Sequence, residues 1–260
     1  MILITSPDNE KIKAATLLRD SAAQRRSSGL CFVEGLRLCA DAAASGRLRC
    51  VFVTEESANA EPEKIDGICA ASESFLITER VAKKLSDTQN PQGIFALCDT
   101  SGLLRDAQDI PAGRYIAAER VCDPGNLGTI IRTAEALGAD GMILSAGCAD
   151  AFSPKVLRAS MGGALRLPLY SAQELSAVLA GLSENGFECL AAMAHSAAAD
   201  VRQVKPVGSF VLVIGNEAVG ITPETGAVCS AVTIPMSGGA ESLNAASAAS
   251  ILLWELFGRA

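Results

Sequence analysis

Short apolar runs that alternate with helix-like segments constrain the fold of this chain more than any other feature of its sequence. Residues 210–215 (FVLVIG) form an unbroken apolar run, which is typical of a parallel strand covered by helices on both faces. Similar runs at 115–119 and 141–145 are separated by a segment of helical composition. The pattern predicts an α/β fold built on a parallel sheet.

The first hundred residues show the same rhythm on a smaller scale. Residues 8–26 are rich in helix-forming residues and place Ile12, Ala15, Leu18 and Ala22 at roughly helical spacing, so we expect one amphipathic helix there. Short apolar strand candidates follow at 31–35, 50–54, 74–77 and 94–98.

Residues 99–113 mix Gly, Pro, Ser and Asp without a clear period, which is the composition of a linker. We therefore predict a small N-terminal α/β domain over residues 1–99, a linker over 100–113 and a second α/β domain over 114–260. Each domain is long enough to bury a core of its own.

The charge of the chain is unevenly distributed. The formal net charge is −7 and the pI is about 4.9, which argues against coating of nucleic acid through bulk charge. Residues 1–50 nevertheless hold eight cations against five anions. These cations form either an ordinary solvated helix face or a local basic contact surface.

The cysteine and histidine content of the chain argues against several kinds of site. The nine cysteines are widely scattered and form no CxxC pair, so the sequence indicates neither a disulfide framework nor a zinc knuckle. His195 is the single histidine, which leaves little material for Ser/His/Asp or metal chemistry. No run approaches the roughly 18 apolar residues of a spanning helix. We expect a cytoplasmic protein without a membrane partner.

Three polar loops, each after a predicted strand, are the candidate site, because ligands of such sheets bind beyond the carboxyl ends of the strands. Gly215 and Gly220 flank an acidic residue and allow either close approach to a ligand or only a tight turn. A helix that begins near Leu127 would let Asn126 and Arg132 converge on one anionic or hydroxyl group. No GxGxxG or P-loop signature is present.

The last loop leads into the closing helix of the chain. Ser242 can cap this helix, with Asn244 in its first turn. Pro235 fixes the backbone directly after the preceding strand.

The three loops contain three sequence motifs whose order along the chain is informative. NxGxxxR at 126–132, GNExxG at 215–220 and IPMxxxxESLNxAxAxxI at 234–251 together resemble the TrmH/SpoU branch of the SPOUT RNA methyltransferases. Residues 32–46 and 83–97 are similar to the substrate-binding domain that precedes the catalytic domain in rRNA 2′-O-ribose methyltransferases of this branch.

The resemblance implies a deep trefoil knot in the C-terminal SPOUT domain, S-adenosylmethionine as cofactor without a metal, and a homodimer that completes the site. It places cofactor contacts at Gly215, Asn216, Glu217, Gly220, Ile234, Met236 and Leu243. It places the catalytic polar residues at Asn126, Arg132, Glu217, Ser242 and Asn244. The implied reaction methylates a ribose 2′-hydroxyl.

Each polar residue then has an expected task. A guanidinium stays protonated at neutral pH, so we expect Arg132 to clamp a phosphate and stabilise the alkoxide, with transient action as a base as the alternative. Asn126 would orient the ribose or Arg132. Ser242 and Asn244 would shape the cofactor and ribose pocket. Glu217 would fix its loop or bind an arginine of the partner subunit.

The implied substrate is RNA. The expected RNA contacts are Lys11, Lys13, Arg19, Arg25 and Arg26 of the predicted first helix. The separate N-terminal domain favours 23S (large-subunit) rRNA. A tRNA 2′-O-methyltransferase and a non-catalytic RNA-binding assembly protein are the alternatives.

Overall fold

A computed structural model describes residues 1–194, 198–239 and 242–258. The chain forms two compact units, each treated by itself below. Unit 1 comprises Met1–Ser101 and Phe152–Leu165, and unit 2 comprises Gly102–Ala151 and Arg166–Ala260. The segment 152–165 therefore packs within unit 1, although the sequence placed it in the second domain. In the described part of the chain, no helix is long and apolar enough to cross a membrane.

Unit 1 is built on a five-stranded sheet of strand order β1-β4-β3-β5-β2. Strand β5 runs antiparallel to both of its neighbours, β2 and β3, so this sheet is mixed rather than parallel. Pairing direction depends on how the chain returns to the sheet, which an apolar run does not encode. The strands are β1 (Ile2–Ile4), β2 (Leu30–Glu34), β3 (Leu48–Thr54), β4 (Glu73–Ile77) and β5 (Ile94–Asp99).

The N-terminal segment of unit 1 forms two helices where the sequence predicted one. The predicted single helix over 8–26 is wrong, because Ser21 is extended and its side chain accepts a hydrogen bond from the Gln24 backbone N–H, which ends one helix and caps the next. The helices are α1 (Glu10–Asp20), α2 (Ala22–Ser28), α3 (Leu36–Ala44), α4 (Glu55–Ala60), α5 (Pro62–Ala70), α6 (Glu79–Leu85), α8 (Pro154–Ala159) and the 3₁₀ turn η1 (Gly163–Leu165).

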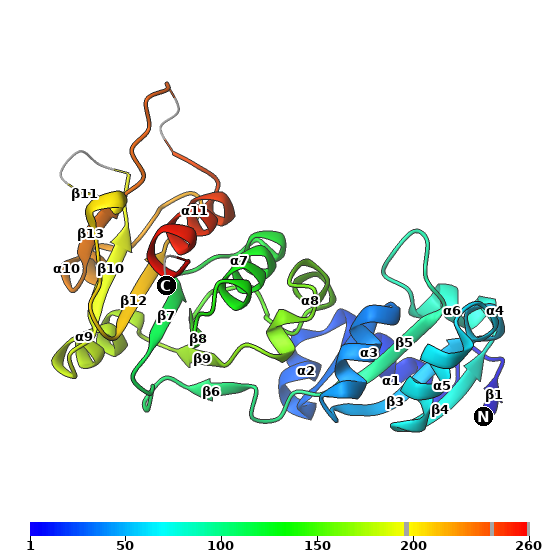
Figure 1. Cartoon of the computed structure of the whole chain (residues 1–260). Helices are drawn as coiled ribbons and strands as arrows, with labels where there is room; N and C mark the ends of the chain where they lie inside the picture. The colour runs from blue at the N-terminus through cyan, green and yellow to red at the C-terminus, as the bar shows by residue number, and fades with distance from the viewer. Residues whose placement is uncertain (195–197, 240–241, 259–260) are drawn as a thin grey trace. The chain divides into compact units, whose positions relative to one another are not determined.

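Unit 2 carries the predicted parallel sheet. All of its strand pairs are parallel, in the order β11-β13-β10-β12-β7-β8-β9-β6 (Figure 1). Strand β6, the first strand of unit 2 along the chain, lies inside the predicted linker and pairs with β9. The strands are β6 (Leu104–Asp106), β7 (Arg114–Ala118), β8 (Gly141–Ser145), β9 (Leu169–Ala172), β10 (Glu188–Ala192), β11 (Ala199–Asp200), β12 (Phe210–Ile214) and β13 (Ser230–Thr233).

Helices cover both faces of the unit 2 sheet, as the apolar run in β12 predicts. Val211 and Val213 share a buried cluster with Leu179 of α9, whereas the Phe210 ring lies 4.8 Å from the Phe257 ring of α11. Alternate strand residues point to opposite faces, so α9 and α11 lie on opposite sides. The helices are α7 (Pro124–Ala136), α9 (Leu175–Glu184), the 3₁₀ turn η2 (Val201–Gln203), α10 (Pro223–Ala227) and α11 (Ala245–Phe257).

Candidate functional site

A cavity of about 360 Å³ lies at the carboxyl ends of β10, β12 and β13 and against the start of α11. It is lined by all seven residues predicted to bind the cofactor and by Ser242, namely Gly215, Asn216, Glu217, Gly220, Ile234, Met236, Ser242 and Leu243. The sequence reasoning missed its wall at Ala192, Met193 and Ala194. Their position at the carboxyl end of the apolar strand β10 was the available signal.

The loop after β12 needs glycine where the chain has it. A Cβ on Gly215 would lie 2.5 Å from the carbonyl carbon of Gly220, so no larger residue fits. Asn216 and Gly220 exchange backbone hydrogen bonds of 3.0 and 2.9 Å. The Asn216 carboxamide oxygen accepts from the backbone N–H groups of Ala218 and Val219 at 2.8 and 3.1 Å. The loop is therefore both a tight turn and a cavity wall.

Glu119, at the end of β7, anchors the chain that follows this loop. Its carboxylate is buried, and it accepts hydrogen bonds from the Thr222 backbone and hydroxyl at 3.0 and 2.7 Å and from the Thr225 hydroxyl at 2.8 Å. A buried carboxylate is tolerated when such donors surround it. The sequence reasoning missed Glu119, although an acid at the end of an apolar strand is an available signal.

Three of the predicted catalytic residues form one hydrogen-bonded chain. The Asn126 amide group donates to a Glu217 carboxylate oxygen at 2.8 Å, and the Asn244 amide group donates to the Asn126 oxygen at 3.1 Å. The three side chains come from α7, from the loop after β12 and from the N-terminus of α11. Because Asn126 is bonded on both sides, its amide faces Glu217 in a fixed orientation.

Arg132 does not join this cluster. Helix α7 begins at Pro124, with Asp123 as its N-cap, which is three residues earlier than expected. Six helical residues turn the chain by about 600°, so Asn126 and Arg132 lie about 120° apart around the axis. The condition for their convergence, a helix that begins near Leu127, is therefore not met.

Arg132 instead lines an open groove between α7 and α11, where Ile251 and Trp254 are 41% and 59% exposed. Its side chain is exposed, and among the described residues it has no hydrogen-bond or ion-pair partner. The groove lies outside the cavity, since the cavity wall does not include Arg132.

Helix α11 begins later than expected. Asn244, rather than Ser242, is its N-cap, and the Asn244 carboxamide oxygen accepts from the backbone N–H groups of Ala246 and Ser247 at 2.9 and 3.2 Å. Asn caps a helix as well as Ser does, so sequence alone does not choose between them. Ser242 remains on the cavity wall without this duty.

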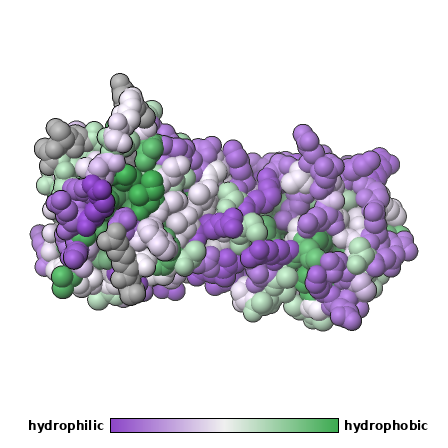
Figure 2. Space-filling model, turned by 45° about the horizontal axis from the view of Figure 1, so that its top comes forward, coloured by the Kyte–Doolittle hydropathy of each residue, from purple (hydrophilic) through white to green (hydrophobic). Residues whose placement is uncertain are grey.

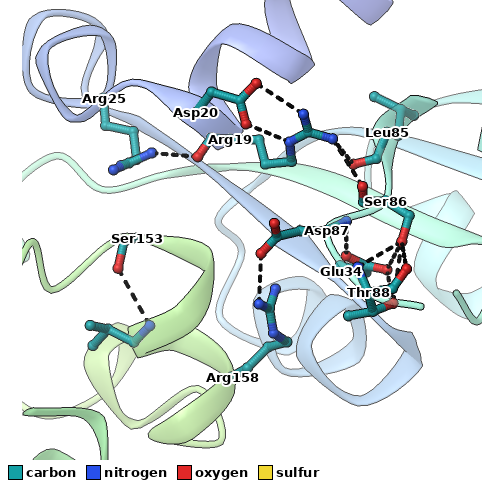
Figure 3. Close-up of polar contacts among 11 residues, drawn as sticks. Arg19, Asp20, Arg25, Glu34, Leu85, Ser86, Asp87, Thr88, Ser153 and Arg158 are labelled. Carbon is teal, nitrogen blue, oxygen red and sulfur yellow. Dashed lines mark hydrogen bonds and ion pairs between the residues drawn. The ribbon is translucent and has the colours of Figure 1, made fainter. Parts of the chain in front are cut away.

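Two of the predicted RNA-contacting arginines hold helix ends together. Arg19 Nη1 donates to the backbone carbonyls of Lys84, Leu85 and Ser86 at 2.9, 3.1 and 3.0 Å, at the C-terminus of α6. Figure 3 shows Arg19 beside Leu85 and Ser86. Arg25, only 6% exposed, donates through Nη1 to the carbonyls of Leu18 and Arg19 at 2.6 and 2.9 Å. These carbonyls lack partners within their helices. The prediction of an exposed RNA-binding face is wrong for Arg19 and Arg25.

The other three cations stay at the surface of unit 1. Lys11 Nζ lies 3.1 Å from a Glu73 carboxylate oxygen and 4.7 Å from the centre of the Phe75 ring. Lys13 pairs with Glu10 at 3.2 Å, and Arg26 is exposed. Hydrophilic residues predominate on the face of unit 1 seen in Figure 2. Lys11, Lys13 and Arg26 remain candidates for RNA contact.

Metal chemistry has no visible site in the described ranges 1–194, 198–239 and 242–258, where no three His, Cys, Asp or Glu side chains are grouped to hold an ion. His195, the single histidine, lies outside these ranges.

Comparison with known families covers both parts of the chain. Residues 113–254 match the SpoU rRNA Methylase family, and residues 9–96 match the MRM3-like substrate binding domain. The chain belongs to the SpoU rRNA methylase family. The resemblance of the three loop motifs is therefore confirmed.

Relatives of this SpoU methylase match it over nearly its full length. The 23S rRNA (guanosine(2553)-2′-O)-methyltransferase RlmP of Bacillus subtilis is 28% identical, covering 98% of this chain and 99% of the relative. An uncharacterised tRNA/rRNA methyltransferase of Synechocystis is 33% identical, covering 97% and 92%.

A solved structure extends the match to the fold. An AdoMet-bound rRNA methyltransferase from Sinorhizobium meliloti superposes with a TM-score of 0.85 at 30% identity, covering 97% of this chain and 96% of that chain. The SpoU methylase therefore has the predicted two-part α/β fold of this family. The trefoil knot itself stays a prediction.

Proposed function

We propose that this SpoU methylase transfers the methyl group of S-adenosylmethionine to a ribose 2′-hydroxyl of large-subunit rRNA in the cytoplasm. The observation that carries the proposal is the cavity at the ends of β10, β12 and β13, whose wall includes every residue that the family motifs assign to the cofactor. The named activity of RlmP and the AdoMet-bound state of the Sinorhizobium relative support it. The match of residues 9–96 to a substrate-binding domain supports an RNA substrate.

The residues of the cavity suit this cofactor. Its volume of about 360 Å³ falls within the range of small-molecule sites, roughly 300–1,000 Å³. Ile234, Met236 and Leu243 offer apolar walls for a flat aromatic group. Gly215 has no space for a side chain, so backbone groups of its loop come close to the bound molecule.

When bound, S-adenosylmethionine supplies an electrophilic methyl group on a sulfonium, which passes to the ribose oxygen as the carbon–sulfur bond breaks. The chain must align the ribose hydroxyl and assist the loss of its proton. Glu217 lies on the cavity wall with one carboxylate oxygen held by Asn126 at 2.8 Å. Asn126 and Asn244 therefore act as positioning residues, and the Glu217 carboxylate is the anionic group available to orient a cation or the hydroxyl.

A homodimer would supply a cation, since none of the described residues that line the cavity is a lysine or an arginine. Arg132 lies in the groove beside Ile251 and Trp254, and large apolar side chains with such exposure favour burial by a second copy. A twofold interface applies the same face twice, so α7 and α11 of each copy would meet. We propose that Arg132 of the partner subunit approaches Glu217, binds the RNA phosphate and stabilises the forming alkoxide.

The deciding experiment measures transfer of labelled methyl to rRNA and tRNA fractions from cells that lack the enzyme, followed by mapping of the modified ribose. Label on one ribose of large-subunit rRNA is expected. Label on tRNA alone would overturn the choice of substrate, and the absence of S-adenosylmethionine binding would overturn the activity.

Two variants test the arginine and the dimer. Arg132→Ala should abolish turnover while S-adenosylmethionine still binds, whereas Arg105→Ala, an exposed arginine of unit 2, should leave turnover unchanged. Trp254→Glu should convert a dimer into a monomer in analytical ultracentrifugation and remove turnover. Near-normal turnover of Arg132→Ala, or a wild-type monomer that methylates RNA, would refute the composite site.

A further inference from the structure

The loop that follows α6 in unit 1 is fixed from inside by a buried carboxylate. Glu34, 6% exposed at the end of β2, accepts hydrogen bonds from the hydroxyls of Ser86 and Thr88, each at 2.7 Å, and from the Asp87 backbone N–H at 3.0 Å (Figure 3). Three donors satisfy this carboxylate, so its charge is directed toward the loop and away from solvent. The start of the loop is thus held in one arrangement.

The far end of the same loop is fixed as firmly. The Gln92 carboxamide oxygen accepts from the backbone N–H of Leu36 at 2.8 Å, at the start of α3. A Cβ on Gly35 (φ +103°) would lie 3.1 Å from that oxygen. Gly93 has φ +68°, and a Cβ there would lie 2.4 Å from the Thr54 hydroxyl. Both turns therefore require glycine, and the loop is preorganised before any ligand arrives.

A pocket of about 320 Å³ lies between this loop, the start of α3 and the segment around α8. Two guanidinium groups, two carboxamides and two apolar side chains line it, and they belong to Arg37, Arg158, Asn90, Gln92, Leu38 and Met161. The Glu34 carboxylate and the Thr88 hydroxyl, which are hydrogen-bonded to each other, also lie on its wall.

The two arginines differ in what holds them. Arg158 donates through Nη2 to an Asp87 carboxylate oxygen at 2.7 Å, which fixes its guanidinium at the pocket (Figure 3). Its Nη1 is buried and has no hydrogen-bond partner among the described residues, an unfavourable state that an incoming acceptor oxygen would relieve after a small shift. Arg37 is exposed, and no hydrogen bond or ion pair within the described ranges engages it.

We propose that this pocket binds one unpaired nucleotide of the RNA substrate. Leu38, Met161 and the guanidinium planes suit a base face, the carboxamides of Asn90 and Gln92 suit a base edge, and Arg37 with Arg158 suits the phosphate. A double helix is too wide for a pocket of this size, whereas proteins that recognise RNA sequence take up unstacked single bases. The inference rests on the proposed RNA substrate and adds a sequence-reading contact made by residues outside the methyl-transfer motifs.

The test uses the full-length protein, cognate large-subunit rRNA and an unrelated RNA of equal length. Arg37→Ala should weaken binding of both RNAs about tenfold and reduce the slope of log K against log salt by about one. Asn90→Ala should weaken binding of the cognate RNA about tenfold and leave the unrelated RNA unchanged. Both should raise KM for RNA without changing kcat or the S-adenosylmethionine affinity. Arg49→Ala, an exposed arginine paired with Asp99 outside the pocket, is the matched control.

Cognate-RNA affinity, salt slope and KM like those of the wild type in both pocket variants would overturn the inference. Tight binding of a free nucleoside monophosphate, lost in Arg37→Ala without any change in RNA affinity, would also overturn it and indicate a small-molecule site. If the wild-type protein binds rRNA through this pocket but transfers no methyl to it, the proposed activity fails while this inference stands.

Discussion

Arg25 shows how a charged side chain can serve the backbone instead of the solvent. It is 6% exposed, and its Nη1 reaches the carbonyls of Leu18 and Arg19 where α1 ends. The last carbonyls of a helix have no partner within it, and a guanidinium offers several donors to satisfy them. The neighbouring Arg26 is exposed and has no such task among the described residues.

We therefore expect Arg25→Ala to lower the free energy of unfolding by about 2 kcal/mol, since it removes charged hydrogen bonds and leaves buried carbonyls unpaired. Arg26→Ala is the matched control and should change it by less than about 0.5 kcal/mol. Urea unfolding followed by circular dichroism measures both. Equal effects of the two variants would contradict the assignment of Arg25 to the end of α1.

The thiols also separate by environment. Burial raises the pKa of Cys50 to about 11 and raises the pKa of Cys39 further, so both remain protonated thiols at neutral pH. Cys122 is exposed in the loop between β7 and α7. The thiolate is the form that reacts with iodoacetamide.

Alkylation of the native protein at about pH 8 should modify Cys122 first and spare Cys39 and Cys50, because a raised pKa leaves little thiolate until the pH approaches it. Peptide mass spectrometry over a time course gives the order. In urea all three should react at similar rates. Rapid native labelling of Cys39 or Cys50 would show that helix α3 or strand β3 is more open than the structure has it.

At the scale of elements, one side chain at the N-terminus of α11 both caps the helix and contacts another predicted catalytic residue. The Asn244 carboxamide oxygen caps the helix, while its amide group donates to Asn126 at 3.1 Å. Asp can keep the first of these interactions but, when ionised, has no hydrogen to donate.

Asn244→Asp should therefore retain the melting temperature but lower methyl transfer about tenfold or more, because Asn126 and Glu217 lose their orientation. Asn244→Ala should lose both, with a stability cost of about 1 kcal/mol for the missing cap. Calorimetry and the transfer assay read the two effects separately. Full activity of Asn244→Asp would show that the Asn126 contact does not matter for turnover.

Local signals explain which elements the sequence predicts and which it does not. The apolar run of β12 predicts a strand covered on both faces, and all five of its residues are buried. The break at Ser21 and the early start of α7 at Pro124 depend on caps that local composition only permits. The cavity residues were predictable from ordered motifs, whereas the position of Arg132 depends on the phase of helix α7, which the motifs do not encode.

At the scale of the whole molecule, each unit has its own hydrophobic core and its own pocket. One buried cluster in unit 1 centres on Phe32, Phe52, Phe75 and Phe95, and another in unit 2 surrounds β7 and β12. The cavity is lined by unit 2 residues alone, and the nucleotide pocket by unit 1 residues alone. Cofactor binding and RNA reading should therefore be separable by experiment.

Hydrogen exchange tests this separation directly. At a hundredfold excess over its Kd, S-adenosylmethionine should add about 2.7 kcal/mol of protection to backbone amides of unit 2 near residues 192–194, 214–221 and 232–239, and none to the unit 1 sheet. Gly215→Ala should abolish this protection, because its Cβ would lie 2.5 Å from the Gly220 carbonyl carbon and force the loop that lines the cavity to shift. Cofactor-dependent protection of the unit 1 loop that is hydrogen-bonded to Glu34 would contradict this prediction. It would show that cofactor binding in unit 2 also stabilises unit 1.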